Sequence, residues 1–305
     1  IGRSRAASGG AAAEASPLAT GERHMGCQQH AWPAHAPEQV EAEVNYIRDN
    51  GQRPVAYTYP APAGTPQHSA LLQPTRVAIR NARLLAQPAS LEREGFQLVR
   101  EASAVGDFED EAQVRERYYP ESIALLRRLT GAAEAVIFDH TLRVDQAGRE
   151  ERGLREPVRY VHNDQTLRSA PRRVRDHLPA ERAERRLAGR FQIVNLWRPF
   201  GHPAQRAPLA LLDARSLAFD DLVASDLVYR DKVGETYSVK PNPEHRWYYY
   251  PHLLPEEALL LKIYDSREDA QARLGAHTAF DDPCTPADAP PRQSIELRCL
   301  LFFDE

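Results

Sequence analysis

The second half of the chain is patterned as short hydrophobic runs rather than as long periodic segments. The runs are rich in β-branched and aromatic residues and are separated by clusters of Pro, Gly and Asp, which is typical of strands joined by turns. They cover residues 135–138, 158–162, 191–197, 247–250, 258–264 and 294–303. Short strands without long helices between them predict a mainly β fold with helical additions, arranged as a sandwich or a barrel.

The first half of the chain has a different pattern of apolar and polar residues and divides into two parts. Residues 1–36 begin with a stretch dominated by Ala, Gly, Ser and Arg, without an apolar period, and are predicted to be a disordered tail. Residues 37–131 are predicted to be a mixed, partly helical extension. This extension is expected to pack on a core domain made of residues 132–305.

Helical signals are few and local. Residues 38–49 are interpreted as a short helix or a helix-to-strand transition, and residues 111–129 as the clearest helix, with Gly131 as its C-cap. A further helix is predicted over residues 179–187, which begin with proline. Arginines are frequent between residues 168 and 190, but acidic residues alternate with them. This mixture favours a solvated helical face over a phosphate-binding patch.

The composition restricts the partners that the protein is expected to have. Hydrophobic residues make up 42% and charged residues 27% of the 305 residues, as in an ordinary globular protein. The net charge of −4 gives no electrostatic reason to expect nucleic acid or an anionic membrane, and no apolar run is long enough to span a bilayer. The three cysteines show no C-x-x-C spacing, which argues against a disulfide framework or a structural zinc site. We therefore expect a cytoplasmic protein that binds a small-molecule substrate, with no nucleic acid and no membrane.

Two residues at the end of the 158–162 run are candidate metal ligands. Successive side chains of a strand point to opposite faces, so His162 and Asp164 should project to the same side and could share one metal ion. His277, far along the chain, is a candidate third ligand. Two histidines and one carboxylate with open positions opposite them suit non-haem Fe(II). The short motif alone leaves an alternative open, in which His162 and Asp164 form a hydrogen-bonded pair at a strand end.

The predicted strand at 191–197 carries an amide on an apolar face. Alternation places Asn195 beside Ile193 and Trp197, and a buried amide requires a hydrogen-bonding partner, either the backbone or a ligand. Arg198 lies on the opposite face and is expected at the surface or in an interface.

The last predicted strand has one apolar and one polar face. The polar face carries Arg292, Ser294, Glu296 and Arg298. If this face lines a barrel, Arg292 can bind a carboxylate through two hydrogen bonds, and the Ser294 hydroxyl can donate a further one. A solvated outer face is the alternative, because half-exposed antiparallel strands are common.

Several segments in a fixed order resemble one known family. They are FDHTLR at 138–143, HNDQT at 162–166, IVNLWRP at 193–199, GETY at 234–237, HRWY at 245–248, KIYDS at 262–266, HTAF at 277–280 and RQSIELR at 292–298. Together they resemble the group that contains the cephamycin-methoxylation protein, fungal hydroxylase/desaturases and an endoperoxide-forming enzyme. The similarity spans most of residues 135–305.

The resemblance implies a double-stranded β-helix core, also called a jelly roll and similar to the cupins. It implies an oxygenase that uses Fe(II), 2-oxoglutarate as co-substrate and O2 to hydroxylate or desaturate a small metabolite, in secondary metabolism. By motif position, His162, Asp164 and His277 would be the iron ligands.

The resemblance also suggests how the co-substrate is held. Arg292 and Ser294 resemble the R-x-S pair that binds the co-substrate carboxylate in the penicillin-synthase-like branch. Fourteen residues separate His277 from Arg292, more than is usual in that branch, so Arg298 stays open as a second candidate anchor. Asn195 is a further candidate for contact with the co-substrate.

Two other classes of function stay open at this point. The chain could be a non-catalytic, cupin-like accessory subunit that binds a metabolite or a partner enzyme, because a fold alone does not define function. It could also be a zinc- or manganese-dependent hydrolase or isomerase with the same ligands, against which the R-x-S pair argues. The sequence leaves open whether the chain forms a homodimer or pairs with a partner biosynthetic enzyme.

Overall fold

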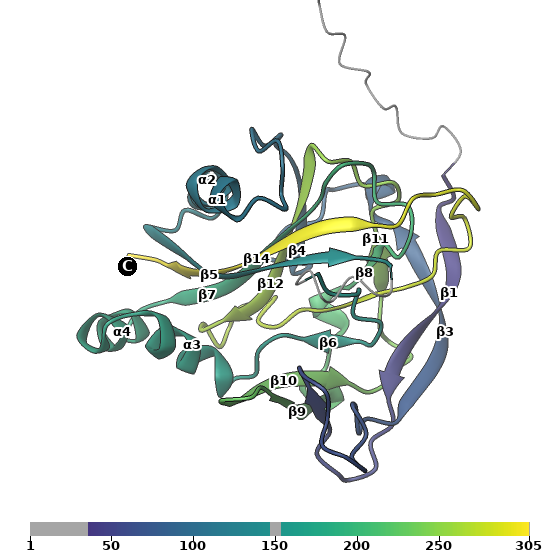
Figure 1. Ribbon diagram of the computed structural model, residues 1–305, viewed down its shortest axis with the longest axis horizontal. Coiled ribbons are helices and arrows are strands. Elements are labelled where there is room, and N and C mark those ends of the chain that lie inside the picture. The colour runs from purple at the N-terminus through teal and green to yellow at the C-terminus, as the bar shows by residue number, and fades with distance from the viewer. Residues whose placement is uncertain (1–35, 147–153, 305) are drawn as a thin grey trace, which may run out of the picture. The chain divides into compact units, whose positions relative to one another are not determined.

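Two β-sheets form the body of the protein (Figure 1). The structure is a computed structural model that describes residues 36–146 and 154–304. The predicted tail, residues 1–36, therefore lies outside the described residues except for its last position.

The smaller sheet has five strands in the order β4-β12-β7-β14-β5. Its strands are β4 (Phe96–Arg100), β5 (Glu134–Val144), β7 (Phe191–Pro199), β12 (Glu257–Asp265) and β14 (Gln293–Phe302). The larger sheet has nine strands in the order β1-β3-β11-β8-β13-β6-β10-β9-β2. Its strands are β1 (Gln39–Ile47), β2 (Val55–Tyr57), β3 (Leu72–Asn81), β6 (His162–Asn163), β8 (Leu209–Leu212), β9 (Leu222–Val228), β10 (Val233–Val239), β11 (Trp247–Tyr249) and β13 (Ala276–Ala279).

The chain passes back and forth between the two sheets. The strands β5, β6, β7 and β8 alternate between the smaller and the larger sheet, and β11, β12, β13 and β14 then alternate in the opposite sense. The neighbours are β5-β14-β7-β12 in one sheet and β6-β13-β8-β11 in the other. This arrangement confirms the predicted double-stranded β-helix, with β1–β4, β9 and β10 as additions at the sheet edges.

Helices cover one face and one end of this core. The segment α1 (Glu111–Gln113), a π-helical stretch (Val114–Tyr118) and α2 (Tyr119–Thr130) run continuously and end at Gly131, which adopts φ 74°. This confirms the predicted helix and its C-cap, because glycine enters the left-handed region without steric cost. The apolar side of this helical segment packs on the outer face of β14.

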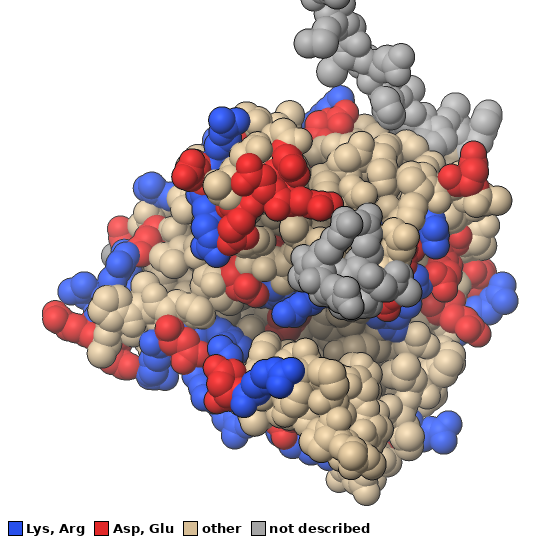
Figure 2. All heavy atoms as spheres, in the orientation of Figure 1, with Lys and Arg blue, Asp and Glu red and all other residues tan. Residues whose placement is uncertain are grey.

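Two more helices, α3 (Ser169–His177) and α4 (Ala180–Leu187), pack against the apolar core between the sheets. Ala183 is the buried residue of α4. The charged side chains of this helix form ion pairs, Arg185 and Arg186 with carboxylates and Glu184 with Arg175 of α3. Figure 2 shows basic and acidic atoms interspersed in this region. The predicted solvated face is therefore confirmed for α4.

The expected helix at residues 38–49 is wrong, because this segment is strand β1. Its buried side chains occur at every second position, at Val40, Ala42, Val44 and Tyr46, and it pairs with β3 over its whole length. Alternation with period two and the hydrogen bonds to β3 outweigh the helix propensity of its Glu and Ala residues. The extension predicted for residues 37–131 thus supplies four strands to the two sheets, whereas a domain boundary after residue 131 stays a prediction.

The predicted strand at 158–162 is shorter than expected, since β6 contains two residues. The segment before it makes isolated backbone hydrogen bonds to two different partners. The Val161 N–H donates to the Asn45 carbonyl at 2.8 Å, and the Ala279 N–H donates to the Val158 carbonyl at 2.9 Å. Regular pairing with β10 and β13 therefore begins at His162.

Arg198 is buried rather than exposed, because the α1–α2 segment covers the outer face of β7. Its guanidinium donates to the Tyr118 hydroxyl at 3.2 Å and to the Pro255 carbonyl at 2.7 Å. The expected surface or interface position was wrong, since strand alternation defines the face of a side chain but not what covers that face.

Gly275 lets β13 approach the neighbouring sheet closely. A Cβ atom at this position would lie 2.5 Å from the Lys262 carbonyl oxygen. We expect Gly275→Ala to lower the free energy of unfolding by about 1–3 kcal/mol, because the backbone would have to move. Urea unfolding measures this. Gly106→Ala is the control, since its Cβ would meet its nearest neighbour at 3.8 Å and should change stability by less than about 0.5 kcal/mol. Equal stability of Gly275→Ala and the parent would contradict this account of β13.

Candidate metal centre

Two histidines face each other on neighbouring strands of the larger sheet. His162 on β6 pairs directly with His277 on β13, and their ring centroids lie 4.6 Å apart. Asp164 follows β6, one residue beyond its end. Ligand atoms of the three side chains all lie within 4.8 Å of one another, so they can share one metal ion.

The orientation of His162 leaves one ring nitrogen free. Its Nδ1 lies 2.9 Å from the Tyr160 carbonyl oxygen. Because a carbonyl only accepts hydrogen bonds, Nδ1 must carry the proton, and Nε2 keeps its lone pair. This Nε2 lies 3.5 Å from Oδ1 of Asp164. A backbone hydrogen bond that orients the ring in this way is typical of a metal-binding histidine.

The carboxylate of Asp164 is held by one oxygen and free at the other. Oδ2 accepts hydrogen bonds from Asn195 Nδ2 at 2.9 Å and from Arg298 Nε at 3.0 Å. Oδ1 is the oxygen that faces His162. The arrangement therefore presents a single carboxylate oxygen beside two imidazoles.

Electrostatics keep Asp164 and His277 in their metal-binding forms. Burial disfavours the charged carboxylate, but the Arg298 guanidinium beside it holds the pKa of Asp164 well below its usual range. Burial lowers the pKa of His277 to about 4, helped by the neighbouring His162, so this imidazole is neutral at pH 7. Burial opposes the charge of Arg298 too, but the carboxylates of Glu296 and Asp164 raise its pKa above the usual value.

A small cavity lies between the two histidines and the polar face of β14. Its lining includes His162, His277 and Arg292, together with Arg143 and Glu296. Of the two alternatives for the polar face of β14, the structure favours a cavity for Arg292 and Glu296, which both line it.

Arg292 is buried without a carboxylate partner. It is 1% exposed, lies over the Trp197 ring at 5.4 Å and donates from Nη1 to the Ala207 carbonyl. Within the described ranges, no carboxylate lies close enough to Arg292 to form an ion pair, and its Nε and the buried Ser294 hydroxyl have no hydrogen-bonding partner. Burial lowers the pKa of Arg292 to about 9, which still leaves the guanidinium charged at pH 7. A buried cation of this kind is suited to an anionic ligand.

Arg298, in contrast, is fully engaged within the protein. Besides Asp164, its guanidinium donates to Asp139 at 3.0 Å, to Thr141 at 2.9 Å and to Glu296 at 3.3 Å. The Asn195 NH2 group is likewise engaged, because it also donates to Glu296 at 2.6 Å, whereas its buried amide oxygen has no hydrogen-bonding partner among the described residues.

All the predicted site residues meet in this region, and the structure adds others. Arg143 lies opposite Ser294 in the β5–β14 pair and 3.9 Å from Glu296. Asp139, on the same strand, pairs with Arg298. Both belong to the FDHTLR segment, but no spacing rule distinguishes them from surface charges. Their place follows from the pairing of β5 with β14, which the sequence alone does not define.

Two imidazoles and one carboxylate oxygen beside a cavity are a ligand set that could hold one metal ion and that suits non-haem iron. Comparisons with known proteins agree with this class. A family model described as "YDMC: Oxidoreductase/YMDC permease-like domain" matches residues 44–302.

Several curated proteins are similar over most of their length. The hydroxylase/desaturase efuI of Hormonema carpetanum is 32% identical over 87% of this chain and 96% of its own length. The Fe(II)/2-oxoglutarate-dependent dioxygenase nvfI of Aspergillus novofumigatus is 33% identical over 86% of this chain and 96% of its own length. A solved structure of the iron and alpha-ketoglutarate-dependent endoperoxidase NvfI superimposes with a TM-score of 0.79 and 30% identity, covering 88% of this chain and 100% of that one.

The chain belongs to this family, together with the fungal hydroxylase/desaturases and 2-oxoglutarate-dependent dioxygenases. The predicted resemblance is thereby confirmed. The protein is a non-haem iron dioxygenase whose cofactors are Fe(II), 2-oxoglutarate and O2, and its substrate is a small molecule. Among the described residues, none of the helices is long and apolar enough to cross a membrane.

The metal-free protein should lose stability as the pH falls from about 6.5 toward 4. In this window the unfolded chain protonates His277, whereas the folded protein, with its pKa at about 4, does not, so acid favours unfolding. The expected loss from this residue between about pH 7 and 5 is roughly 2 kcal/mol. Urea unfolding of the metal-free protein at these pH values measures it. His277→Gln cannot titrate and should show a correspondingly smaller loss, and identical losses would contradict the pKa shift.

Proposed function

We propose that His162, Asp164 and His277 are the iron ligands of this oxygenase. The observation that carries the proposal is the Asp164 carboxylate, of which one oxygen is held by Asn195 and Arg298 and the other faces His162. This division supports coordination through one oxygen, with the neighbouring donors fixing the orientation of the ligand.

We further propose that Arg292 and Ser294 bind the distal carboxylate of 2-oxoglutarate. Both side chains are buried and keep unused hydrogen-bond donors, and Arg292 lines the cavity that His162 and His277 also line. Arg298 is the weaker candidate, because its donors are taken by four groups of the protein. Asn195 acts on the iron site through Asp164 rather than through direct contact with the co-substrate.

When bound, Fe(II) with 2-oxoglutarate and O2 supplies oxidising chemistry in which the co-substrate loses CO2 to give succinate and a C–H bond of the substrate is oxidised. The protein's residues set the conditions for this reaction. The neutral imidazole of His277 and the ionised carboxylate of Asp164 need no proton loss to act as ligands. Trp197, Leu209 and Val158 contribute apolar walls that exclude water from the cavity.

The substrate is a small organic metabolite of secondary metabolism, and hydroxylation or desaturation is the reaction that the relatives' names favour. The alternative of a non-catalytic accessory subunit is disfavoured, because such a protein needs neither an intact triad nor a buried, unpartnered arginine. A cytoplasmic location and association into a homodimer or with a partner biosynthetic enzyme stay predictions.

Replacing any triad residue with Ala should abolish stoichiometric Fe(II) binding, because two ligands hold the ion far more weakly than three. Equilibrium dialysis under anaerobic conditions measures binding, and circular dichroism checks the fold. His140→Ala is the control, since His140 pairs with Tyr119 at 2.8 Å and Glu111 at 3.1 Å, outside the triad. Stoichiometric iron in His277→Ala would disprove the triad assignment.

Substitution of Arg292, which precedes β14, and of Arg298, which lies on β14, should impair different binding steps. We expect Arg292→Ala to weaken 2-oxoglutarate binding by about 2–5 kcal/mol, because a buried charge pair is lost. Arg298→Ala should weaken Fe(II) binding by about 10–100-fold, because Asp164 loses its main hydrogen-bond donor. Anaerobic titrations of iron, and of 2-oxoglutarate into the iron-loaded protein, separate the two effects. Normal 2-oxoglutarate affinity in Arg292→Ala would overturn the anchor assignment.

A further inference from the structure

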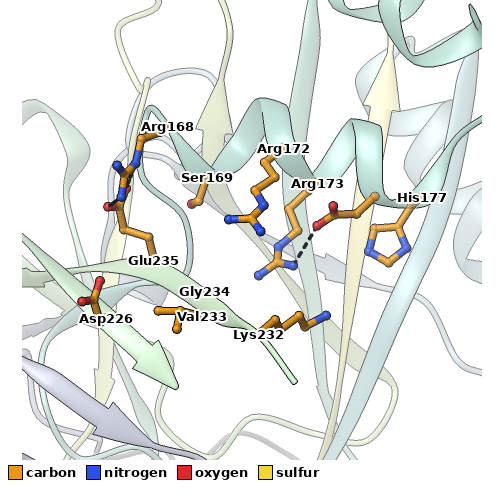
Figure 3. A pocket seen from close by; sticks show the side chains of 11 residues that line it. Arg168, Ser169, Arg172, Arg173, His177, Asp226, Lys232, Val233, Gly234 and Glu235 are labelled. Atoms are coloured by element: carbon orange, nitrogen blue, oxygen red, sulfur yellow. Dashed lines mark hydrogen bonds and ion pairs between the residues drawn. The ribbon is translucent and has the colours of Figure 1, made fainter. Parts of the chain in front are cut away.

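A second, larger cavity lies between α3 and β10. Its volume is about 580 Å³, within the range of small-molecule binding sites. Figure 3 shows it from close by, with α3 on one side and the start of β10 on the other. Basic side chains predominate in its lining, namely Arg168, Arg172 and Arg173 from the helix and Lys232 from the turn before β10.

Two segments of the chain connect this groove with the metal centre. His177 in the groove stacks on Phe138 with ring centroids 4.9 Å apart, and the next residue, Asp139, pairs with Arg298. On the other side Glu235 accepts a hydrogen bond from Thr166, two residues after the candidate ligand Asp164. The lining of the groove is therefore linked through Phe138 and Thr166 to segments that carry Asp139 and Asp164.

Some of the charges in the groove are neutralised within the protein. Arg168 pairs with Glu235, and Arg173 lies 3.4 Å from Asp176. Arg53, which does not line the groove, forms ion pairs with both Asp226 and Glu235. These pairs account for every carboxylate of the lining.

Two basic side chains of the lining have no acidic partner among the described residues. In the described part of the chain, no carboxylate lies within ion-pair distance of Arg172 or Lys232. Lys232 contacts the Tyr229 ring at 5.4 Å, and Figure 3 shows the Arg172 guanidinium reaching from α3 toward β10. Arg172 and Lys232 are both exposed, so the predicted solvated helical face describes α3 as well as α4.

Gly234 lets two side chains of this region pack closely on the backbone of β10. A Cβ at Gly234 would lie 3.3 Å from the Tyr229 ring and 3.5 Å from Arg173 Nη2. A side chain here would crowd both groups, so the glycine supports the observed position of Arg173.

We propose that this groove binds the organic substrate and that Arg172 and Lys232, supported by Arg173, bind an anionic group on it, either a carboxylate or a phosphate. The proposal rests on the proposed function, because it assigns the substrate of the oxygenase to this groove. Guanidinium and ammonium groups without an internal partner are suited to such an anion. The substrate class is thus an acidic metabolite.

The test compares three probes of the same size and aromatic body, namely 2-naphthoate, 2-naphthyl phosphate and methyl 2-naphthoate. Equilibrium dialysis is carried out with the iron- and 2-oxoglutarate-loaded protein under anaerobic conditions and with the metal-free protein. We expect at least one anion to bind about ten-fold or more tightly than the neutral ester. The tighter of the two anions distinguishes a carboxylate from a phosphate substrate. Equal affinity for anions and ester, or no binding of either anion, would overturn the proposal.

Substitutions then locate the binding. Arg172→Gln and Lys232→Gln should each weaken binding of the anion by about ten-fold and leave the ester unchanged. Arg175→Gln is the matched control, since Arg175 lies on α3 but pairs with Glu184 at 2.6 Å, away from the groove. Unchanged anion affinity in both groove variants would refute the site. Iron and 2-oxoglutarate affinities of the variants should equal those of the parent. A failure of the parent to bind iron would count against the proposed function, whereas the metal-free titrations would still test the groove.

Discussion

The hydrogen bonds from Asn195 and Arg298 to one oxygen of Asp164 tie the two sheets together at the metal centre. Asp164 follows a strand of the larger sheet, whereas Asn195 and Arg298 project from β7 and β14 of the smaller one. Breaking a buried charge pair of this kind leaves an uncompensated charge and is strongly destabilising. The separation of the sheets and the pairing of β7 with β14 must therefore satisfy this contact.

Because Arg298 takes part in this contact, the two arginines of this region differ in their partners. Arg298 and Arg292 are six residues apart, which in extended chain corresponds to roughly 20 Å, so they cannot act on one carboxylate. Arg298 is neutralised by acidic groups of the protein, but Arg292 is buried with only a backbone carbonyl and an aromatic ring as partners. Its unpaired charge is compatible with a stable fold because an anionic co-substrate can neutralise it. Stability and function thus depend on the same polar face.

Much of this face could be predicted from the sequence, because strand alternation is a local property. The order of Ser294, Glu296 and Arg298 between apolar neighbours already indicated one polar side, and the His-x-Asp spacing indicated paired ligands. The roles of Arg143 and Arg198 could not be predicted, since they depend on which strand or helix lies alongside. Similarly, β1 resembles a helix in composition, and its pairing with β3 decides its structure. The pairing of strands and the covering of a sheet face by a helix depend on residues far apart in the chain. A single sequence carries little information about either.

The central claim is that the triad and Arg292 together form one site for Fe(II) and 2-oxoglutarate. The most direct test is an anaerobic titration of the unsubstituted protein with Fe(II) and then with 2-oxoglutarate, followed by visible absorption. The account predicts one iron per chain and a weak visible charge-transfer band that appears only when both are present. Iron that binds without producing the band on addition of 2-oxoglutarate, or no iron binding at all, would contradict it.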